Sequence, residues 1–325
     1  MSRPRLLALL SAAAIANAVG NLTSNGCADA PGFQSCQDAA NEKIKACFSK
    51  TKGDGVAQQA CACEDYILNY NCYAAHCWNR VWECEYQEYL VSYLMDCPIA
   101  KLPVPYFPIP DSAAGACSCN VGKVYKAITD SITQGASCMK NVHGTDAILR
   151  GDKIGACGCC EISGAMSSIF EICRDTKPDL VGMASVSKIQ TQLDINFREC
   201  QPMTKINCAS DLNFSLAGVS TYFPPSSLPT SGTATLSNNP GSVTAPPSGS
   251  VFSYTNGGDK VVYTITAASA SNRKDSESGA SSSAAATTAS KKGAAASVMV
   301  PKRLSMAITG ISLMAGVIAR WSLLA

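Results

Sequence analysis

Histidine and charged residues are scarce in this sequence, and both shortages limit what the protein can do. Only two histidines, His76 and His143, occur in 325 residues. No HExxH zinc motif, GxSxG nucleophile motif or Walker-type phosphate loop is present. The charged fraction is 15% and the formal net charge +2, which leaves no basic field for nucleic acid. We therefore expect a protein that is not an enzyme and that uses no metal or cofactor.

Three neighbouring glutamates, Glu83, Glu85 and Glu88, come nearest to a catalytic pair. A glycosidase needs two carboxylates that flank the scissile sugar bond. Acidic residues on one amphipathic helix are usually its solvated face, and we interpret these three in that way. His76 lies beside Cys77 on a predicted helix and is interpreted as a structural histidine.

Residues 1–18 have the pattern of a secretory signal peptide. Arg3 and Arg5 form a positive start, residues 6–15 a short apolar run, and residues 16–18 a small-x-small cleavage site. An apolar run of about ten residues is too short to span a bilayer of roughly 30 Å. The mature chain is expected to begin near Val19.

The C-terminal residues 298–325 include a long apolar tail, with which the sequence ends. Three small residues beginning at Gly293 and a short polar spacer precede this tail. Small residues, spacer and apolar tail in this order form the signal for a GPI lipid, which replaces the tail. We predict attachment at Gly293, with Ser290 and Ala294 as near competitors. A retained transmembrane helix is the alternative.

Cysteines are plentiful between Cys27 and Cys208 and absent beyond. Their even number, 18, together with a secretory start, predicts nine disulfides in an oxidising compartment. A thiolate metal site at residues 157–160 is the alternative, which such a compartment opposes. The predicted disulfide cysteines are Cys27, Cys36, Cys47, Cys61, Cys63, Cys72, Cys77, Cys84, Cys97, Cys117, Cys119, Cys138, Cys157, Cys159, Cys160, Cys173, Cys200 and Cys208.

A weak internal repeat runs through this region. Ala-Cys-x-Cys occurs three times, beginning at Ala60, Ala116 and Ala156, each time before a helix-like segment that ends in another cysteine. We interpret each occurrence as a helix start pinned by two bridges. Cysteines so close in sequence rarely bond each other comfortably, so each sulfur is expected to reach a different element.

Residues 19–212 are predicted to form an all-α, disulfide-rich head. Residues 98–111 contain five prolines and are interpreted as an extended connector that docks onto the same protein. Helical spacing of apolar residues predicts helices over residues 33–49, 56–70, 72–95 and 183–197.

Aromatic side chains form one stripe on the predicted helix 72–95. Aromatic residues at helical spacing usually pack in a core, which is the preferred interpretation. The alternative is an exposed platform on which a wall glycan, haem or another flat ligand stacks. The stripe consists of Trp78, Trp82, Tyr86, Tyr89 and Tyr93.

Residues 213–297 are mostly Ser, Thr, Ala, Gly and Pro and show no sustained apolar period. Such a composition cannot offset the entropy of ordering and predicts a disordered, O-glycosylated stalk. One island, residues 250–266, has the pattern of a hairpin turning at Asn256. Sequons at Asn21 and Asn213 are predicted N-glycosylation sites.

Signal peptide, cysteine-rich helical head, Ser/Thr-rich stalk and GPI tail, in this order, resemble the fungal GPI-anchored cysteine-rich cell-surface proteins. Cys-x-Cys followed by a helix is also similar to the fungal CFEM domain, some members of which bind haem through an aspartate. No aspartate directly precedes a Cys-x-Cys here, so this resemblance assigns no haem ligand.

The resemblance to the fungal GPI-anchored cysteine-rich proteins implies a structural or interaction protein at the outer face of the plasma membrane or in the cell wall. Its expected partners are the membrane, through the GPI lipid, and cell-wall glycan, with no nucleic acid.

Overall fold

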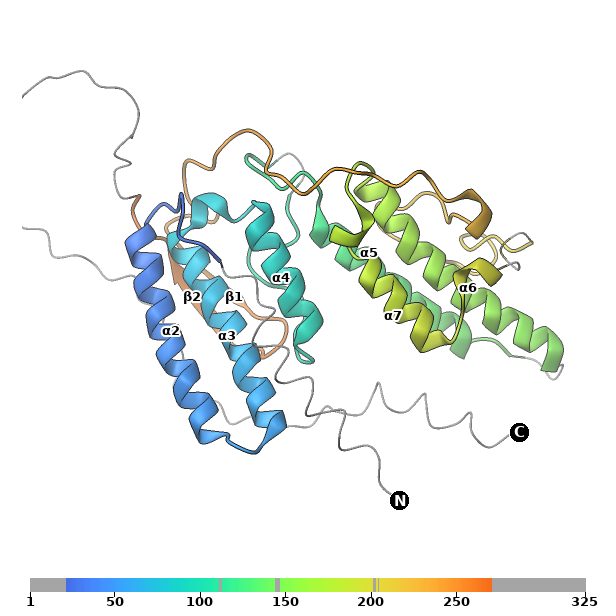
Figure 1. Cartoon of the computed structure of the whole chain (residues 1–325), viewed down its shortest axis with the longest axis horizontal. Coiled ribbons are helices and arrows are strands. Elements are labelled where there is room, and N and C mark those ends of the chain that lie inside the picture. The colour runs from blue at the N-terminus through green and yellow to red at the C-terminus, as the bar shows by residue number, and fades with distance from the viewer. Residues whose placement is uncertain (1–21, 111–112, 144–146, 201–202, 204, 271–325) are drawn as a thin grey trace, which may run out of the picture.

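Two helical lobes lie side by side in the computed structural model shown in Figure 1. The structure describes residues 22–110, 113–143, 147–200, 203 and 205–270. The predicted signal peptide, the Asn21 sequon, the Gly293 attachment site and the C-terminal propeptide lie outside the described residues.

The first lobe contains α2 (Ala30–Lys50), α3 (Gly55–His76) and α4 (Cys84–Asp96). Aspartate side chains start the first two helices by accepting hydrogen bonds from the first turn. Asp29 accepts from Gly32 N, and Asp54 accepts from Val56 N and Ala57 N. These local caps explain why both helices begin where apolar spacing predicts.

The second lobe contains α5 (Val121–Lys140), α6 (Ala147–Ile172) and α7 (Met183–Leu193). Asn120 caps α5 by accepting from Lys123 N at 3.0 Å. Gly182, at φ 119°, precedes α7 in a backbone conformation that favours glycine. Asp194, at φ 53°, ends α7 after Leu193, so the last predicted helix is shorter than residues 183–197.

The two lobes share one disulfide plan, in which an inner and an outer bridge join a pair of helices and a third bridge reaches a cysteine that comes after the following helix. In the first lobe these bridges are Cys47–Cys61, Cys36–Cys72 and Cys63–Cys97. Their counterparts in the second lobe are Cys138–Cys157, Cys119–Cys173 and Cys159–Cys200. The predicted internal repeat is thus a repeat of two units.

All nine predicted disulfides are present, and within each Cys-x-Cys the sulfurs reach different elements, as expected. Two of the three Ala-Cys-x-Cys motifs lie inside α3 and α6, so only the one beginning at Ala116 precedes a helix start. The remaining bridges are Cys27–Cys77, Cys160–Cys208 and Cys84–Cys117, the last of which joins the two lobes.

The predicted helix 72–95 is wrong, because the chain leaves the helix between His76 and Cys84. A short 3-10 helix, Trp78–Arg80, occupies this break. The connector that follows α4 docks onto the core as predicted, with Val104, Phe107 and Ile109 buried.

The predicted stalk is also wrong over residues 213–270, which lie on the two lobes. Residues 213–250, here called the strap, run from the second lobe across the junction to the first, along the upper edge of Figure 1. Ala234 N donates to Asp175 O, and Ser237 O accepts from Ser118 N at 2.7 Å. The folded head therefore extends past residue 212. Residues 271–297 lie outside the described residues.

After the strap the chain forms the predicted hairpin, so the head is not purely helical. Strands β1 (Val251–Thr255) and β2 (Val262–Thr266) pair antiparallel. Ile265 is fully buried against α3. The side chain of Asn256 is also fully buried and donates to the hydroxyl of Tyr70.

Candidate functional site

Four of the five predicted stripe residues are buried in the first lobe. Their exposed fractions are 4% for Trp78, 0% for Tyr86, 4% for Tyr89 and 0% for Tyr93, while Trp82 is half-buried. The first two members lie in the break between helices, so the five do not form one helical stripe. Their interpretation as core is confirmed, and the alternative of an exposed aromatic platform is wrong.

These rings belong to a tyrosine-rich core with internal polar contacts. Tyr73 and Tyr86 stack with ring centroids 5.2 Å apart. The Tyr86 hydroxyl donates to Pro105 O at 3.0 Å, and the Tyr254 hydroxyl donates to Asn71 at 2.6 Å. Burial raises the pKa of Tyr93 to about 12, so this hydroxyl stays neutral at physiological pH.

Arg80 binds two of the three glutamates considered for catalysis. Its guanidinium lies 2.8 Å from both Glu83 and Glu85, and its side chain is only 15% exposed. Glu83 also accepts from Asn238 of the strap at 3.0 Å. Glu83 and Glu85 are thus committed to an ion-paired network at the lobe junction, not to a fully solvated face. A free carboxylate pair for sugar cleavage is not formed by these residues.

His76 contacts the N-terminal cap of α2, as expected of a structural histidine. Its Nδ1 lies 2.8 Å from Asp29 Oδ2, and the residue is 4% exposed. The other histidine, His143, is exposed after the end of α5. Among the described residues, no group of histidine, cysteine and acidic side chains has a geometry suited to a metal ion.

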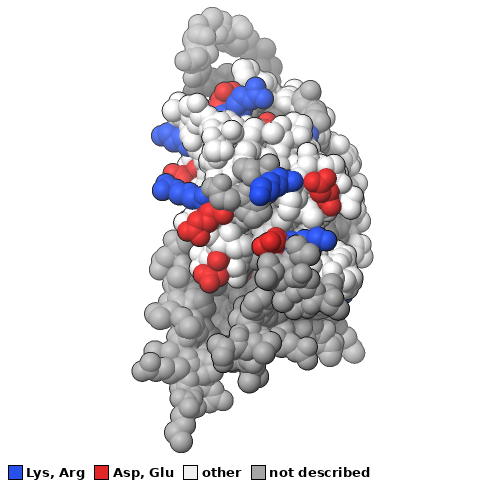
Figure 2. Space-filling model, turned by 90° about the vertical axis from the view of Figure 1, so that its right-hand side faces the viewer, with Lys and Arg blue, Asp and Glu red and all other residues white. Residues whose placement is uncertain are grey.

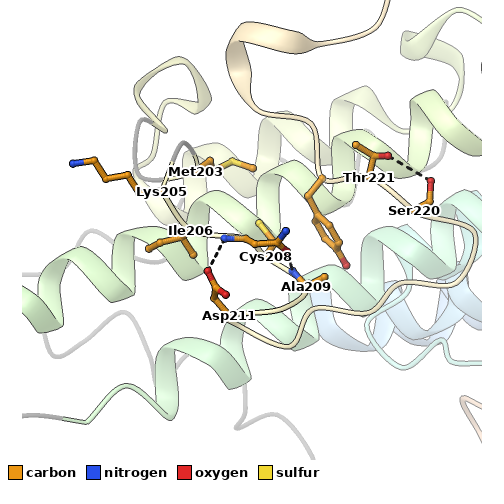
Figure 3. A pocket seen from close by; sticks show the side chains of 10 residues that line it. Met203, Lys205, Ile206, Cys208, Ala209, Asp211, Ser220 and Thr221 are labelled. Carbon is orange, nitrogen blue, oxygen red and sulfur yellow. Dashed lines mark hydrogen bonds between the residues drawn. The ribbon is translucent and has the colours of Figure 1, made fainter.

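A hollow of about 500 Å³ opens beside the last disulfide of the second lobe (Figure 3). Two of its polar side chains, Asp211 and Ser220, are already hydrogen-bonded to nearby groups, while the buried hydroxyl of Tyr222 has no partner among the described residues. Asp211 accepts from Asn207 N at 2.9 Å, and the Ser220 hydroxyl donates to Glu171 at 2.9 Å. We therefore assign no ligand to this hollow. It is lined by Met203, Lys205, Ile206, Asn207, Cys208, Ala209, Asp211, Ser220, Thr221 and Tyr222.

The predicted N-glycosylation site, Asn213, comes two residues after Asp211, which lines this hollow. Asn213 is exposed, whereas Phe214 is 2% exposed. Ser215 exchanges two backbone hydrogen bonds with the side chain of Gln134, each 2.7 Å long. The acceptor asparagine is thus presented outward from a fixed backbone.

Each lobe carries one acidic residue two positions after its Cys-x-Cys, and burial raises the pKa of both. Asp65 on α3 accepts a hydrogen bond from the Asn69 side chain at 2.8 Å. Glu161 on α6 is 4% exposed, and burial raises its pKa to about 8. Its carboxyl lies against α5, where a Cβ added to Gly135 would come within 2.0 Å of Oε2. Sequence reasoning did not identify either residue.

Charges of both signs are mixed on the one face that Figure 2 shows. On the end of the second lobe, Lys and Arg are interspersed with Asp and Glu (Figure 2). In the part of the chain that the structure describes, no helix has the length and apolarity needed to cross a membrane.

Comparison with known proteins does not extend this description. No protein-family model matches the chain, and no curated protein or solved structure matches it significantly.

Proposed function

We propose that this chain is a non-enzymatic, GPI-anchored glycoprotein of the outer cell surface, held at the plasma membrane or in the cell wall. Its role there is structural or in interaction with other molecules. The observation that carries the proposal is the pairing of all 18 cysteines in nine disulfides, which suits an oxidising, extracellular compartment. The predicted signal peptide, the exposed Asn213 and the predicted attachment at Gly293 add to this support.

The arrangement of the disulfides supports a role in which the head is exposed to proteases outside the cell. Six of the bridges repeat one arrangement in two lobes, and Cys84–Cys117 joins these lobes. Each bridge restricts the unfolded chain and so opposes local opening to proteases.

The position of the strap changes how such a head would be held. Residues 213–270 belong to the head, so only residues 271–293 would connect it to a lipid at Gly293. At roughly 3.3–3.6 Å per residue, fully extended, this connection reaches at most about 80 Å. We propose a head held near its anchor instead of one carried far out on a long stalk.

Phospholipase treatment of cells that express the full chain tests the anchor. Phosphatidylinositol-specific phospholipase C should release the protein into the medium together with a known GPI-anchored control. A chain lacking residues 304–325 should be secreted without treatment. Retention of the intact chain while the control is released would favour a transmembrane helix and reject the GPI proposal.

The alternative function for the head is binding of cell-wall glycan. With four residues of the aromatic stripe buried, the described residues offer no exposed aromatic platform in support of it. Titration of the purified head with soluble glucans tests it directly, because saturable binding would establish a glycan-binding role and its absence would reject that role for those glucans.

A further inference from the structure

The open edge of the hairpin sheet is a feature that the proposed function does not use. In β1 and β2, hydrogen-bonded and non-hydrogen-bonded pairs alternate. Asn256 N donates to Val261 O and Ala267 N donates to Ser250 O, which fixes the alternation. Val251, Ser253 and Thr255 therefore direct their backbone N–H and C=O groups away from β2.

No described residue pairs with this edge. None of the three outward-directed residues has a backbone hydrogen bond within the described part of the chain, and all three are exposed. Val251 is 57% exposed. The opposite edge, on β2, is less open, because Thr264 and Thr266 are half-buried and Ala268 N donates to Ala75 O on α3.

The devices that usually keep a sheet edge from pairing are missing here. Natural edge strands carry charges, proline or a bulge that discourages another strand. Strand β1 (VFSYT) contains neither charge nor proline, and residues 212–258 contain no charged residue at all. The outward side chains of both strands are Val, Ser and Thr.

We propose that β1 pairs antiparallel with β1 of a second copy of this chain, across a two-fold axis at Ser253. Ser253 then lies opposite Ser253 of the second copy, and Val251 lies opposite Thr255 on both sides. Because these residues present both donors and acceptors, the pairing forms about six backbone hydrogen bonds. The strand is complementary to itself, as a two-fold interface requires.

Such an interface is small, so the dimer is weak and depends on concentration. Display of many copies on one surface would raise the effective concentration and favour pairing. The inference does not rest on the GPI anchor, because the same pairing takes place between copies in solution.

Cysteine cross-linking in cells that express the full chain tests the axis. In a hydrogen-bonded antiparallel pair the Cα atoms lie about 5.5 Å apart, within disulfide range. Ser253→Cys should therefore give a species of twice the mass on non-reducing gels. Ser49→Cys, on the exposed end of α2, adds the same thiol far from the edge and should stay monomeric. Thr264→Cys, on β2, should also stay monomeric.

Equal cross-linking of Ser253→Cys and Ser49→Cys would overturn the proposal. Preferential cross-linking of Thr264→Cys would show that β2 pairs instead of β1 and would also overturn it. Sedimentation of the purified chain gives a second test that needs no new thiol. Its average mass should rise toward twice the monomer between about 1 μM and 1 mM, and Ser253→Lys should abolish this rise while Ser49→Lys preserves it. A constant monomer mass would also overturn the proposal.

Discussion

Replacing Glu161 by glutamine should stabilise the protein more at pH 7 than at pH 5. The folded protein holds this carboxyl with a pKa of about 8, against 4.5 for the exposed group. A raised carboxyl pKa means that the unfolded state loses its proton first, so stability falls as pH rises from about 4.5 to about 8. Below this window the group makes no pH-dependent contribution.

The magnitude follows from linkage. Each pH unit inside the window changes the free energy of unfolding by about 1.4 kcal/mol. Between pH 5 and pH 7 the native protein should lose roughly 2.5 kcal/mol through Glu161. Glutamine has a similar shape but no titratable proton, so the variant escapes this loss.

Guanidinium unfolding at pH 5, 6 and 7, with the disulfides intact, gives the free energy of unfolding of the native protein and of Glu161→Gln. The difference between these two values is then compared from one pH to the next. Subtraction removes the titration of all other groups. The control is Glu42→Gln, whose side chain is 74% exposed, so the difference should stay nearly constant. A Glu161→Gln difference that does not grow between pH 5 and pH 7 would refute the burial of an ionisable carboxyl between α5 and α6.

Two further substitutions test the hairpin turn and the lobe junction. Gly257→Ala should cost roughly 3 kcal/mol and expose the hairpin to proteases, because the new Cβ would come within 2.1 Å of Leu102 O. Gly55→Ala, which meets no atom within 4 Å, should be neutral or stabilising in the same melting and proteolysis assays. Arg80→Ala should lower unfolding free energy by about 3 kcal/mol, since it leaves Glu83 and Glu85 without their cation. Lys45→Ala removes an ion pair with Glu42 in which the two side chains are 73% and 74% exposed. This change should alter the free energy of unfolding by less than about 0.5 kcal/mol.

The disulfide-rich helical head could be predicted because its signals are local. Apolar spacing predicts the first helix and the start of the second closely, although α3 continues to His76. The predicted span 33–49 compares with Ala30–Lys50 in the structure. Disulfide partners could not be predicted, since pairing depends on how the helices pack.

The break before α4 could not be predicted because distant residues maintain it. Residues 77–83 contain neither glycine nor proline. The first N–H of α4, on Cys84, is capped by Asn238 Oδ1 at 2.9 Å, and the Gln87 amide donates to Val81 O at 2.8 Å. A helix start capped from 154 residues away leaves no local pattern.

The sequence does not distinguish the strap from a stalk, for a related reason. Its apolar residues are isolated, so no periodicity marks them as part of a fold. Phe214 and Leu216 are nevertheless 2% and 5% exposed, because each enters a surface that the disulfide-bonded helices already provide. The predicted aromatic stripe requires one continuous helix over residues 72–95, and the break between α3 and α4 removes that helix.

The buried turn at Asn256 has a consequence for how the chain is made. Synthesis proceeds from the N-terminus, so the helices of the first lobe emerge well before this turn. Asn256 nevertheless contacts Tyr70, and Gly257 N donates to Pro103 O at 2.9 Å. The lobe that is synthesised first is therefore completed last, after the second lobe has been made, and a chain arrested before the hairpin would leave its first lobe unfinished.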